Sequence, residues 1–335
     1  MPDLSYSDEL IEVLRNGKQF SLVPHEKPDA DALGSTLGLA LALANAGKQV
    51  RVLVGDVIKQ SLTFLPGFAE LTVSHSANAI AYLDQSDVVL ICDTHEPTLL
   101  GRWIDPLMHV IETGLSNVRV IDHHLPRHES IFPAGWIDPT ISSTAEMVLI
   151  LLEKGRWPIN HAIAQNLMAG IMWDTSRFTN ANTRPQTLLN ASTLINYGAD
   201  VVDINGHLFS LGTADEVRLR GELFESIHLD FEGRYVWVIV TPQMLSKYGV
   251  SESAITGLGN DLRLIEGVKV AAVLFEYEPN STRVSLRSRG GYEVQQIAEQ
   301  YPGGGGHSVA AGCQIELGAA NAAIALKTKI EALFV

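Results

Sequence analysis

Residues 20–46, FSLVPHEKPDADALGSTLGLALALANA, predict the fold of the first half of the chain. Residues 20–23 have the length and composition of a buried strand. Residues 35–46 are rich in Leu and Ala, as in a helix buried against a sheet. A strand followed by a buried helix is the repeating unit of a parallel sheet that carries helices on both faces. Further apolar runs of strand length follow at residues 50–54, 88–91 and 118–121. We therefore expect an α/β domain whose site lies at the carboxyl ends of its strands.

The rest of the chain predicts a second, smaller α/β domain. The pattern turns helical from about residue 184 to 230, and β-rich runs, a helix, a glycine run, a short strand and a last helix follow. We predict a catalytic domain over residues 1–185, a helical connector over 186–230 that could serve as a hinge, and a smaller α/β domain over 231–335.

Composition limits the classes of function. The chain has 335 residues, enough for two domains, and its formal charge of −14 argues against a protein that coats long nucleic acids. Cys92 and Cys313 are too few for a disulfide framework or a thiolate zinc site, which favours a reducing cytoplasm. The first 17 residues are acidic and amphipathic, unlike a signal peptide, and no apolar run of about 18 residues predicts a membrane span.

Polar side chains follow three of the predicted strands and one helix. Each cluster alone has an ordinary explanation: Pro28-Asp29 suits a turn, an Asp after a strand is often a helix cap, and the histidine pair could be an exposed turn. Their coincidence at one edge of one sheet favours a shared site. The residues concerned are His25, Asp29, Asp31, Asp93, Asp122, His123, His124 and Asp174.

Imidazole and carboxylate ligands suit Mn²⁺, Fe²⁺, Co²⁺ or Mg²⁺. We expect Asp29 and Asp31 to point the same way from an extended segment, and a bridging Asp93 to join two metal ions. Two ions about 3.5 to 4 Å apart can activate water and clamp a phosphoryl group. One of the two adjacent histidines, His123 and His124, could bind a metal ion while the other holds a substrate oxyanion, and Asp122 could orient a histidine. The predicted ligands are His25, Asp29 and Asp93 for one ion, and Asp31, Asp93, His123 and Asp174 for the other.

A glycine run near the C-terminus is a candidate anion site. Residues 303–306 are four glycines followed by His307, and their amides could line a concave anion nest, although a flexible turn would have the same sequence. Upstream, Arg287 and Arg289 alternate on a predicted strand and could contact phosphate, or one of them could be a surface charge.

These motifs resemble those of the DHH phosphoesterase superfamily. The segments HEKPDADALGS (25–35), ICDT (91–94), VIDHH (120–124) and WDTSRF (173–178) are similar to its four motifs. SLRS (285–288) and GGGGHSVAAG (303–312) resemble the DHHA1 domain that follows in one subfamily. The resemblance spans nearly the whole chain in order. Within the superfamily, the two-domain length resembles the bifunctional oligoribonucleases and 3′-phosphoadenosine 5′-phosphate phosphatases.

The resemblance implies a hydrolase that uses two divalent ions, Mn²⁺ with Mg²⁺ as the alternative, in a cleft between the domains. Its substrates would be very short RNA, linear dinucleotides such as pApA and pGpG, and 3′-phosphoadenosine 5′-phosphate. Asp93, Asp122 and His124 would be catalytic, with His124 on the scissile phosphate. The rest of the nucleotide would be held by Arg287, Gly303, Gly304, Gly305, Gly306 and His307.

Three other functions stay open. A pyrophosphatase or polyphosphatase would share the metal motifs, but it would carry a Lys/Arg-rich signature in place of the glycine run. A RecJ-like exonuclease would share both domains, but the −14 charge argues against binding to a long strand. A regulator that binds nucleotides without catalysis would not need the full ligand set. We expect no long duplex or membrane partner, and the apolar helices would tolerate a homodimer.

Overall fold

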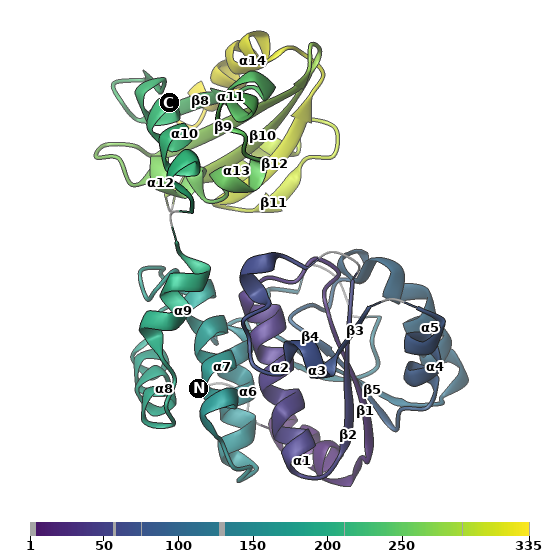
Figure 1. Cartoon of the computed structure of the whole chain (residues 1–335). Coiled ribbons are helices and arrows are strands. Elements are labelled where there is room, and N and C mark those ends of the chain that lie inside the picture. Colours follow the sequence, from purple (N-terminus) through teal and green to yellow (C-terminus); the bar gives the residue numbers. More distant parts are fainter. Residues whose placement is uncertain are drawn as a thin grey trace. The chain divides into compact units, whose positions relative to one another are not determined.

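The computed structural model describes residues 5–55, 58–74, 76–126, 131–210, 212–289 and 291–334 (Figure 1). The chain divides into two compact units, Met1–Ser210 and Leu211–Val335. Among the described helices, none combines the length and the apolar character needed to cross a membrane.

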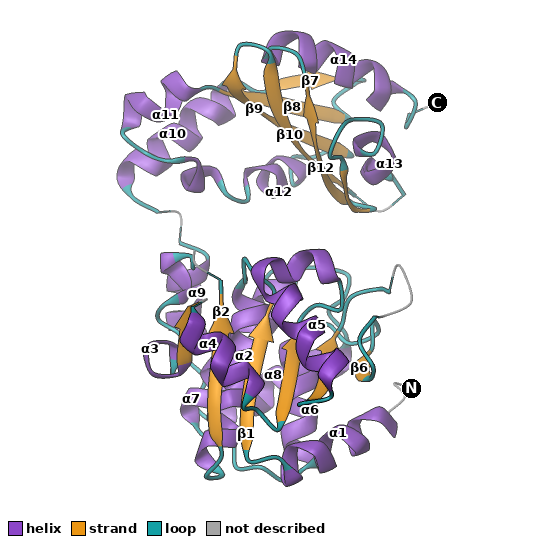
Figure 2. Cartoon of the chain, turned by 90° about the vertical axis from the view of Figure 1, so that its right-hand side faces the viewer, coloured by secondary structure: helices purple, strands orange, loops and turns teal. Residues whose placement is uncertain are grey.

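The first unit is built on a parallel sheet of six strands in the order β3-β2-β1-β4-β5-β6. Figure 2 shows β1 and β2 side by side in this sheet. Four of these strands are the predicted ones, and β3 and β6 are additional strands of three residues each. From β1 the chain adds β2 and β3 on one side, and then β4, β5 and β6 on the other. This reversal of winding direction between β1 and β4 defines a doubly wound sheet. The strands are β1 (Gln19–Pro24), β2 (Gln49–Val54), β3 (Thr72–Ser74), β4 (Val88–Cys92), β5 (Asn117–Asp122) and β6 (Gly135–Ile137).

Helices cover both faces of this sheet, as the sequence predicts. Successive residues of β1 show why: Leu22 packs into the core on one face, and Val23 packs into a separate core on the other. In Figure 1, α2, α6 and α7 lie on one side of the strands, and α4 and α5 lie on the other. The helices are α1 (Ser5–Asn16), α2 (Ala30–Asn45), α3 (Phe68–Leu71), α4 (Ala77–Asp84), α5 (Ile104–Thr113), α6 (Thr144–Lys154), α7 (His161–Asp174), α8 (Pro185–Asn196) and α9 (Val201–Leu208), with 3₁₀ turns η1 (Gln60–Leu62) and η2 (Pro97–Trp103).

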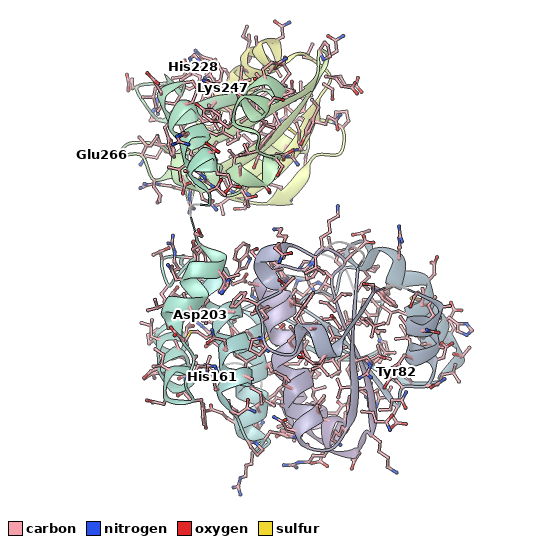
Figure 3. All side chains as sticks on the ribbon, in the orientation of Figure 1. Tyr82, His161, Asp203, His228, Lys247 and Glu266 are labelled. Atoms are coloured by element: carbon pink, nitrogen blue, oxygen red, sulfur yellow. The ribbon has the colours of Figure 1, made fainter. Side chains whose placement is uncertain are left out.

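The segment predicted as a connector, residues 186–230, is divided between the two units. Both α8 and α9 pack against α7, and Gln165 of α7 donates a hydrogen bond to Asp203 of α9 at 2.9 Å. Asp203 is labelled in Figure 3. By contrast, α10 (Ala214–Glu225) packs on α11 and β8 of the second unit. The change from one unit to the other therefore falls after α9.

The second unit is a smaller α/β domain with a mixed sheet, in the order β11-β12-β10-β9-β8-β7. Only β8 and β9 run parallel, and the other neighbours are antiparallel. One core lies beneath α10, α11 and α12, and another lies beneath α13 and α14. The elements are β7 (His228–Asp230), β8 (Tyr235–Val240), α11 (Pro242–Tyr248), η3 (Glu252–Ile255), α12 (Leu258–Arg263), β9 (Val270–Glu278), β10 (Ser281–Ser288), α13 (Val294–Ala298), β11 (Gly305–His307), β12 (Ala310–Ile315) and α14 (Ala319–Glu331).

Candidate active site

Three strand ends bring polar side chains to one edge of the first sheet. His25 follows the end of β1, Asp93 follows the end of β4, and Asp122 is the last residue of β5. The parallel register sets Pro24 opposite Cys92 at this edge. Because the strand order reverses between β1 and β4, the crevice outside their carboxyl ends is the place where a doubly wound sheet binds ligands.

The expectation that Asp29 and Asp31 share one extended segment was wrong, because Asp29 has an extended backbone but Asp31 is helical. Helix α2 begins at Ala30, and Asp29 is its N-cap: Oδ1 of Asp29 accepts hydrogen bonds from the amides of Asp31 and Ala32 at 2.9 and 3.0 Å. Asp31 lies in the first turn and is completely buried. The two carboxylates therefore point into different groups of side chains, described below.

The first turn of α6 holds the Asp31 carboxylate. The amides of Thr144 and Ala145 donate to its two oxygens at 2.7 and 2.9 Å. Amides at the start of a helix stabilise an anion because no helical carbonyl accepts from them. Gly170 of α7 makes room for the carboxylate, since a Cβ there would lie 2.6 Å from Oδ1 of Asp31. Asp31 is thus fixed by three helices before any ligand binds.

Asp93 has a left-handed backbone, with φ of 64°. Asp adopts this conformation more readily than most residues, because its short polar side chain can hydrogen-bond locally. Its amide donates to the carbonyl of Ile121 at 2.9 Å, which ties the end of β4 to β5. The side chain is 2% exposed, and the Thr144 hydroxyl donates to its Oδ1 at 2.7 Å.

The two oxygens of Asp93 face different histidines. Oδ2 lies 3.8 Å from Nε2 of His25, and Oδ1 lies 3.7 Å from Nε2 of His123. The structure brings candidate ligand atoms within 4.8 Å of one another in three overlapping groups. These groups are His25 with Asp29 and Asp93, Asp31 with His123 and Asp174, and Asp93 with His123 and His124.

His123 presents a buried nitrogen to three carboxylates. Its Nε2 lies 2.9 Å from Asp174 and 3.7 Å from both Asp31 and Asp93, yet forms no hydrogen bond within the described part of the chain. A ring nitrogen surrounded by acidic oxygens is the donor set that Mn²⁺ and similar ions accept. The residues present therefore fit divalent metal binding.

Charge at this edge is poorly balanced. Burial, followed by the neighbouring Asp174, raises the pKa of Asp31 to about 7, and burial raises the pKa of Asp93 well above its usual range. Burial acts to lower the pKa of His123, but the nearby carboxylates of Asp174 and Asp31 outweigh it and raise that pKa to about 9. In the described segments only histidines form ion pairs with these acids. A bound cation would supply the missing positive charge.

Asp122 is completely buried between two imidazoles. Its Oδ1 accepts a hydrogen bond from the amide of His124 at 3.1 Å and pairs with Nδ1 of His124 at 2.7 Å, while its Oδ2 pairs with Nδ1 of His95. These histidine contacts hold the pKa of Asp122 below its usual range, although burial opposes them. His95 was not among the predicted site residues. Its one signal in the sequence was its position two residues after Asp93, the aspartate that follows a strand.

The second unit contains a pocket with a volume of about 640 Å³. Predicted residues Arg287, Gly303, Gly305 and Gly306 line it, while Gly304 does not. Burial and the charge of Arg263 lower the pKa of Arg287. The side chain of His307 lies outside the described part of the structure, and only its backbone, in β11, is described.

Gly303 lies in a turn, whereas close packing holds Gly304, and strand pairing holds Gly305 and Gly306. Gly305 pairs with Gly312 in the β11–β12 ladder. A Cβ on Gly304 would lie 1.8 Å from the carbonyl oxygen of Ala298, so only glycine fits there. The backbone of this run therefore forms a fixed part of the pocket wall.

Comparison with known proteins agrees with this architecture. The model of the DHH family N-terminal domain matches residues 19–171, and the DHHA1 domain model matches residues 234–334. The chain belongs to the DHH family of phosphoesterases, whose members hydrolyse phosphoester bonds, and it carries a C-terminal DHHA1 domain.

Individual proteins with known names are also similar to this chain. The chain is 30% identical over 296 residues to the bifunctional oligoribonuclease and PAP phosphatase NrnA of Thermus thermophilus, covering 88% of this chain and 83% of the relative. It is 29% identical over 310 residues to NrnA of Bacillus subtilis, covering 92% of each. The crystal structure of an exopolyphosphatase-related protein from Bacteroides fragilis has the same fold, with a TM-score of 0.90, 23% identity and coverage of 99% and 98%.

Proposed function

We propose that this protein hydrolyses very short oligoribonucleotides and linear dinucleotides to nucleoside 5′-monophosphates, and removes the 3′-phosphate of 3′-phosphoadenosine 5′-phosphate. The observation that carries the proposal is the placement of Asp93, whose two oxygens face His25 on one side and His123 on the other. A carboxylate in that position suits a bridge between two ions. The names of the NrnA relatives supply the substrate class.

Two groups of side chains would hold the metal ions. His25, Asp29 and Asp93 would hold one divalent ion, and Asp31, Asp93, His123 and Asp174 the other. When bound, such ions act as Lewis acids and lower the pKa of coordinated water. Mn²⁺ is our first choice and Mg²⁺ the alternative, because the donors are nitrogen and oxygen.

The side chains around the ligands have separate tasks. Asp122 fixes the orientation of His124 through the 2.7 Å contact to Nδ1, and His124, which is 38% exposed, would contact the scissile phosphate. Thr144 and Ala145 keep Asp31 in position. In the second unit, Arg287 would pair with a phosphate of the substrate, and the glycine backbone of the 640 Å³ pocket would allow that group to come close.

Substrate assays test this function. The purified full chain is incubated with Mn²⁺ or with a chelator, and is offered pApA, 3′-phosphoadenosine 5′-phosphate, a longer RNA, cyclic di-AMP and pyrophosphate in separate reactions. We expect metal-dependent release of AMP from the first two, and slow cleavage of the long RNA. Asp93→Asn controls for contaminating hydrolases in the preparation. It removes the charge of a proposed metal ligand, and Asn tolerates the left-handed backbone at this position.

Other outcomes would change the assignment. Preferred hydrolysis of pyrophosphate, of cyclic di-AMP or of the long RNA would keep the metal chemistry and replace the substrate class. Full activity in Asp93→Asn would contradict the assigned role of Asp93. Metal-dependent nucleotide binding without turnover would favour a regulator.

A further inference from the structure

The proposed chemistry does not use the carboxylate of Glu146 on α6. The residue is completely buried. Its Oε2 accepts hydrogen bonds from the amide of Ser142 at 3.1 Å, from the Ser142 hydroxyl and from the hydroxyl of Thr187 at 3.0 Å. Its Oε1 accepts from Nδ2 of Asn190 at 2.9 Å, and Arg184 lies 3.7 Å away. A buried carboxylate with this many donors is held in one position.

These contacts join α6 to α8. Thr187 and Asn190 belong to α8, whereas Ser142 directly precedes the N-cap of α6. Asn190 is in turn oriented by Gln186, whose amide donates to its Oδ1 at 2.9 Å. Glu146 therefore fixes the start of α6 against a second helix, through groups that are themselves buried.

The segment that Glu146 fixes is the one that holds the candidate ligands. Thr144, two residues before Glu146, donates to Asp31 through its amide and to Asp93 through its hydroxyl, both at 2.7 Å. The carbonyl of Ser142 accepts a hydrogen bond from Asn182 at 2.9 Å, and the same Asn182 amide lies 3.3 Å from the carbonyl of Asp174. A small shift of residues 142–146 would thus move three candidate metal ligands together.

We propose that Glu146 is a positioning residue of the metal centre, which acts by holding residues 142–144 in the arrangement that presents Asp31 and Asp93 to the ions. This inference rests on the metal site of the proposed function. Buried groups beyond the ligands set their orientation, and their loss typically lowers metal affinity about 10- to 100-fold.

Glu146→Gln separates this role from simple packing, because it conserves side-chain volume. The NH₂ of the new side chain must replace either Oε1, where it faces the NH₂ of Asn190, or Oε2, where it faces the amide of Ser142. Donor then meets donor in either orientation. The double variant Glu146→Gln/Asn190→Asp restores the pairing, because the amide introduced at position 146 can donate to a carboxylate at position 190 that still accepts from Gln186.

A matched control lies at the opposite end of the sheet. Ser86 precedes β4 and forms a buried hydrogen bond with Ser21 at 2.8 Å and a partly buried one with the carbonyl of Tyr82 at 2.9 Å. Ser86→Ala removes these bonds and touches no candidate ligand. This variant shows how the loss of a buried hydrogen bond far from the candidate ligands affects Mn²⁺ affinity.

The measurement is Mn²⁺ affinity of the full chain, from the free Mn²⁺ signal in electron paramagnetic resonance, with urea unfolding in chelator for each variant. We expect Glu146→Gln to weaken Mn²⁺ binding about tenfold. Ser86→Ala should bind like the wild type, and the double variant should recover most of the lost affinity. Unchanged affinity in Glu146→Gln, or an equal loss in Ser86→Ala, would overturn the inference.

Three further outcomes are distinguishable. If Glu146→Gln does not fold, Thr187→Val decides. It keeps the Glu146 carboxylate and removes one of its donors, together with the 3.3 Å hydrogen bond that the Thr187 hydroxyl accepts from the amide of Arg184. We expect weaker Mn²⁺ binding, and wild-type affinity there would refute the role. If the wild type binds no Mn²⁺ and turns over no substrate, the proposed function fails together with this inference. Normal Mn²⁺ binding in every variant refutes the inference alone.

Discussion

The hydroxyl of Thr144 donates to Oδ1 of Asp93 at 2.7 Å, across 51 positions of sequence, and both side chains are buried. Thr144 also donates its amide to Asp31 at 2.7 Å. One residue at the start of α6 therefore holds two acids from different elements, Asp31 in the first turn of α2 and Asp93 after the end of β4. Their separation is set by the protein, which lowers the cost of assembling a metal site when the ion arrives.

Thr144→Val tests that contact. Val keeps the shape and the backbone amide but removes the hydroxyl, so Asp93 loses a donor while Asp31 keeps its own. We expect an activity loss of about tenfold and a stability loss of about 1 to 3 kcal/mol. Thr144→Ser, which restores the hydroxyl, should recover the activity. The measurements are initial rates on pApA and urea unfolding, and equal activity of the Val and Ser variants would argue against the contact.

Gly170→Ala, on α7, should destabilise the protein by crowding the Asp31 carboxylate. A Cβ at Gly170 would lie 2.6 Å from Oδ1 of Asp31 and 2.5 Å from Cβ of Ala145, so either α7 or the carboxylate must shift. Overpacking of this kind costs about 1 to 3 kcal/mol. Gly206→Ala is the control, because nothing lies within 4 Å of a Cβ there and Ala favours the helix by up to about 1 kcal/mol. Unfolding midpoints of the two variants should move in opposite directions.

Much of this site follows from local sequence. The strand ending at Cys92 is a run of Val, Leu and Ile, and every residue in it is buried. Once such runs are placed in a parallel sheet, their following residues must meet at one edge. That geometry was enough to bring His25, Asp93 and His123 together, because each follows its strand almost at once.

Other features depend on contacts that no local pattern contains. Glu146, Thr144 and His95 look like ordinary polar residues in sequence, and their importance comes from partners 27 to 113 positions away. The start of α2 was misjudged because two acids that flank one residue, Asp29 and Asp31, also suit an extended segment. Here Asp29 caps the helix, which therefore begins at Ala30.

The glycine run offers a paired test in the second unit. Gly305 lines the 640 Å³ pocket, and a Cβ there would meet nothing within 4 Å, so Gly305→Ala should fold normally and narrow the pocket. We expect a higher KM for pApA with little change in unfolding. Gly304→Ala should instead destabilise the unit, since its Cβ would lie 1.8 Å from the Ala298 carbonyl. If Gly305→Ala leaves KM unchanged, the pocket does not hold the substrate.

Asp87 should make stability depend on pH at a place remote from the site. Its carboxylate accepts from the amides of Gln19 and Lys18 at 3.0 and 2.8 Å, at the start of β1, and these bonds lower its pKa. Because the pKa of Asp87 is lower in the folded state, its carboxylate stabilises the fold at any pH above its pKa in the unfolded state, near 3.8. This contribution disappears as the pH falls through the pKa of the folded state. Asp87→Asn should therefore cost about 1 kcal/mol or less at neutral pH, because the group is exposed, and progressively less in acid. Urea unfolding of both proteins in chelator, at neutral pH and below pH about 4, measures the difference. If the difference in free energy of unfolding between the two proteins stays constant or widens on acidification, the carboxylate charge contributes nothing to stability at this position.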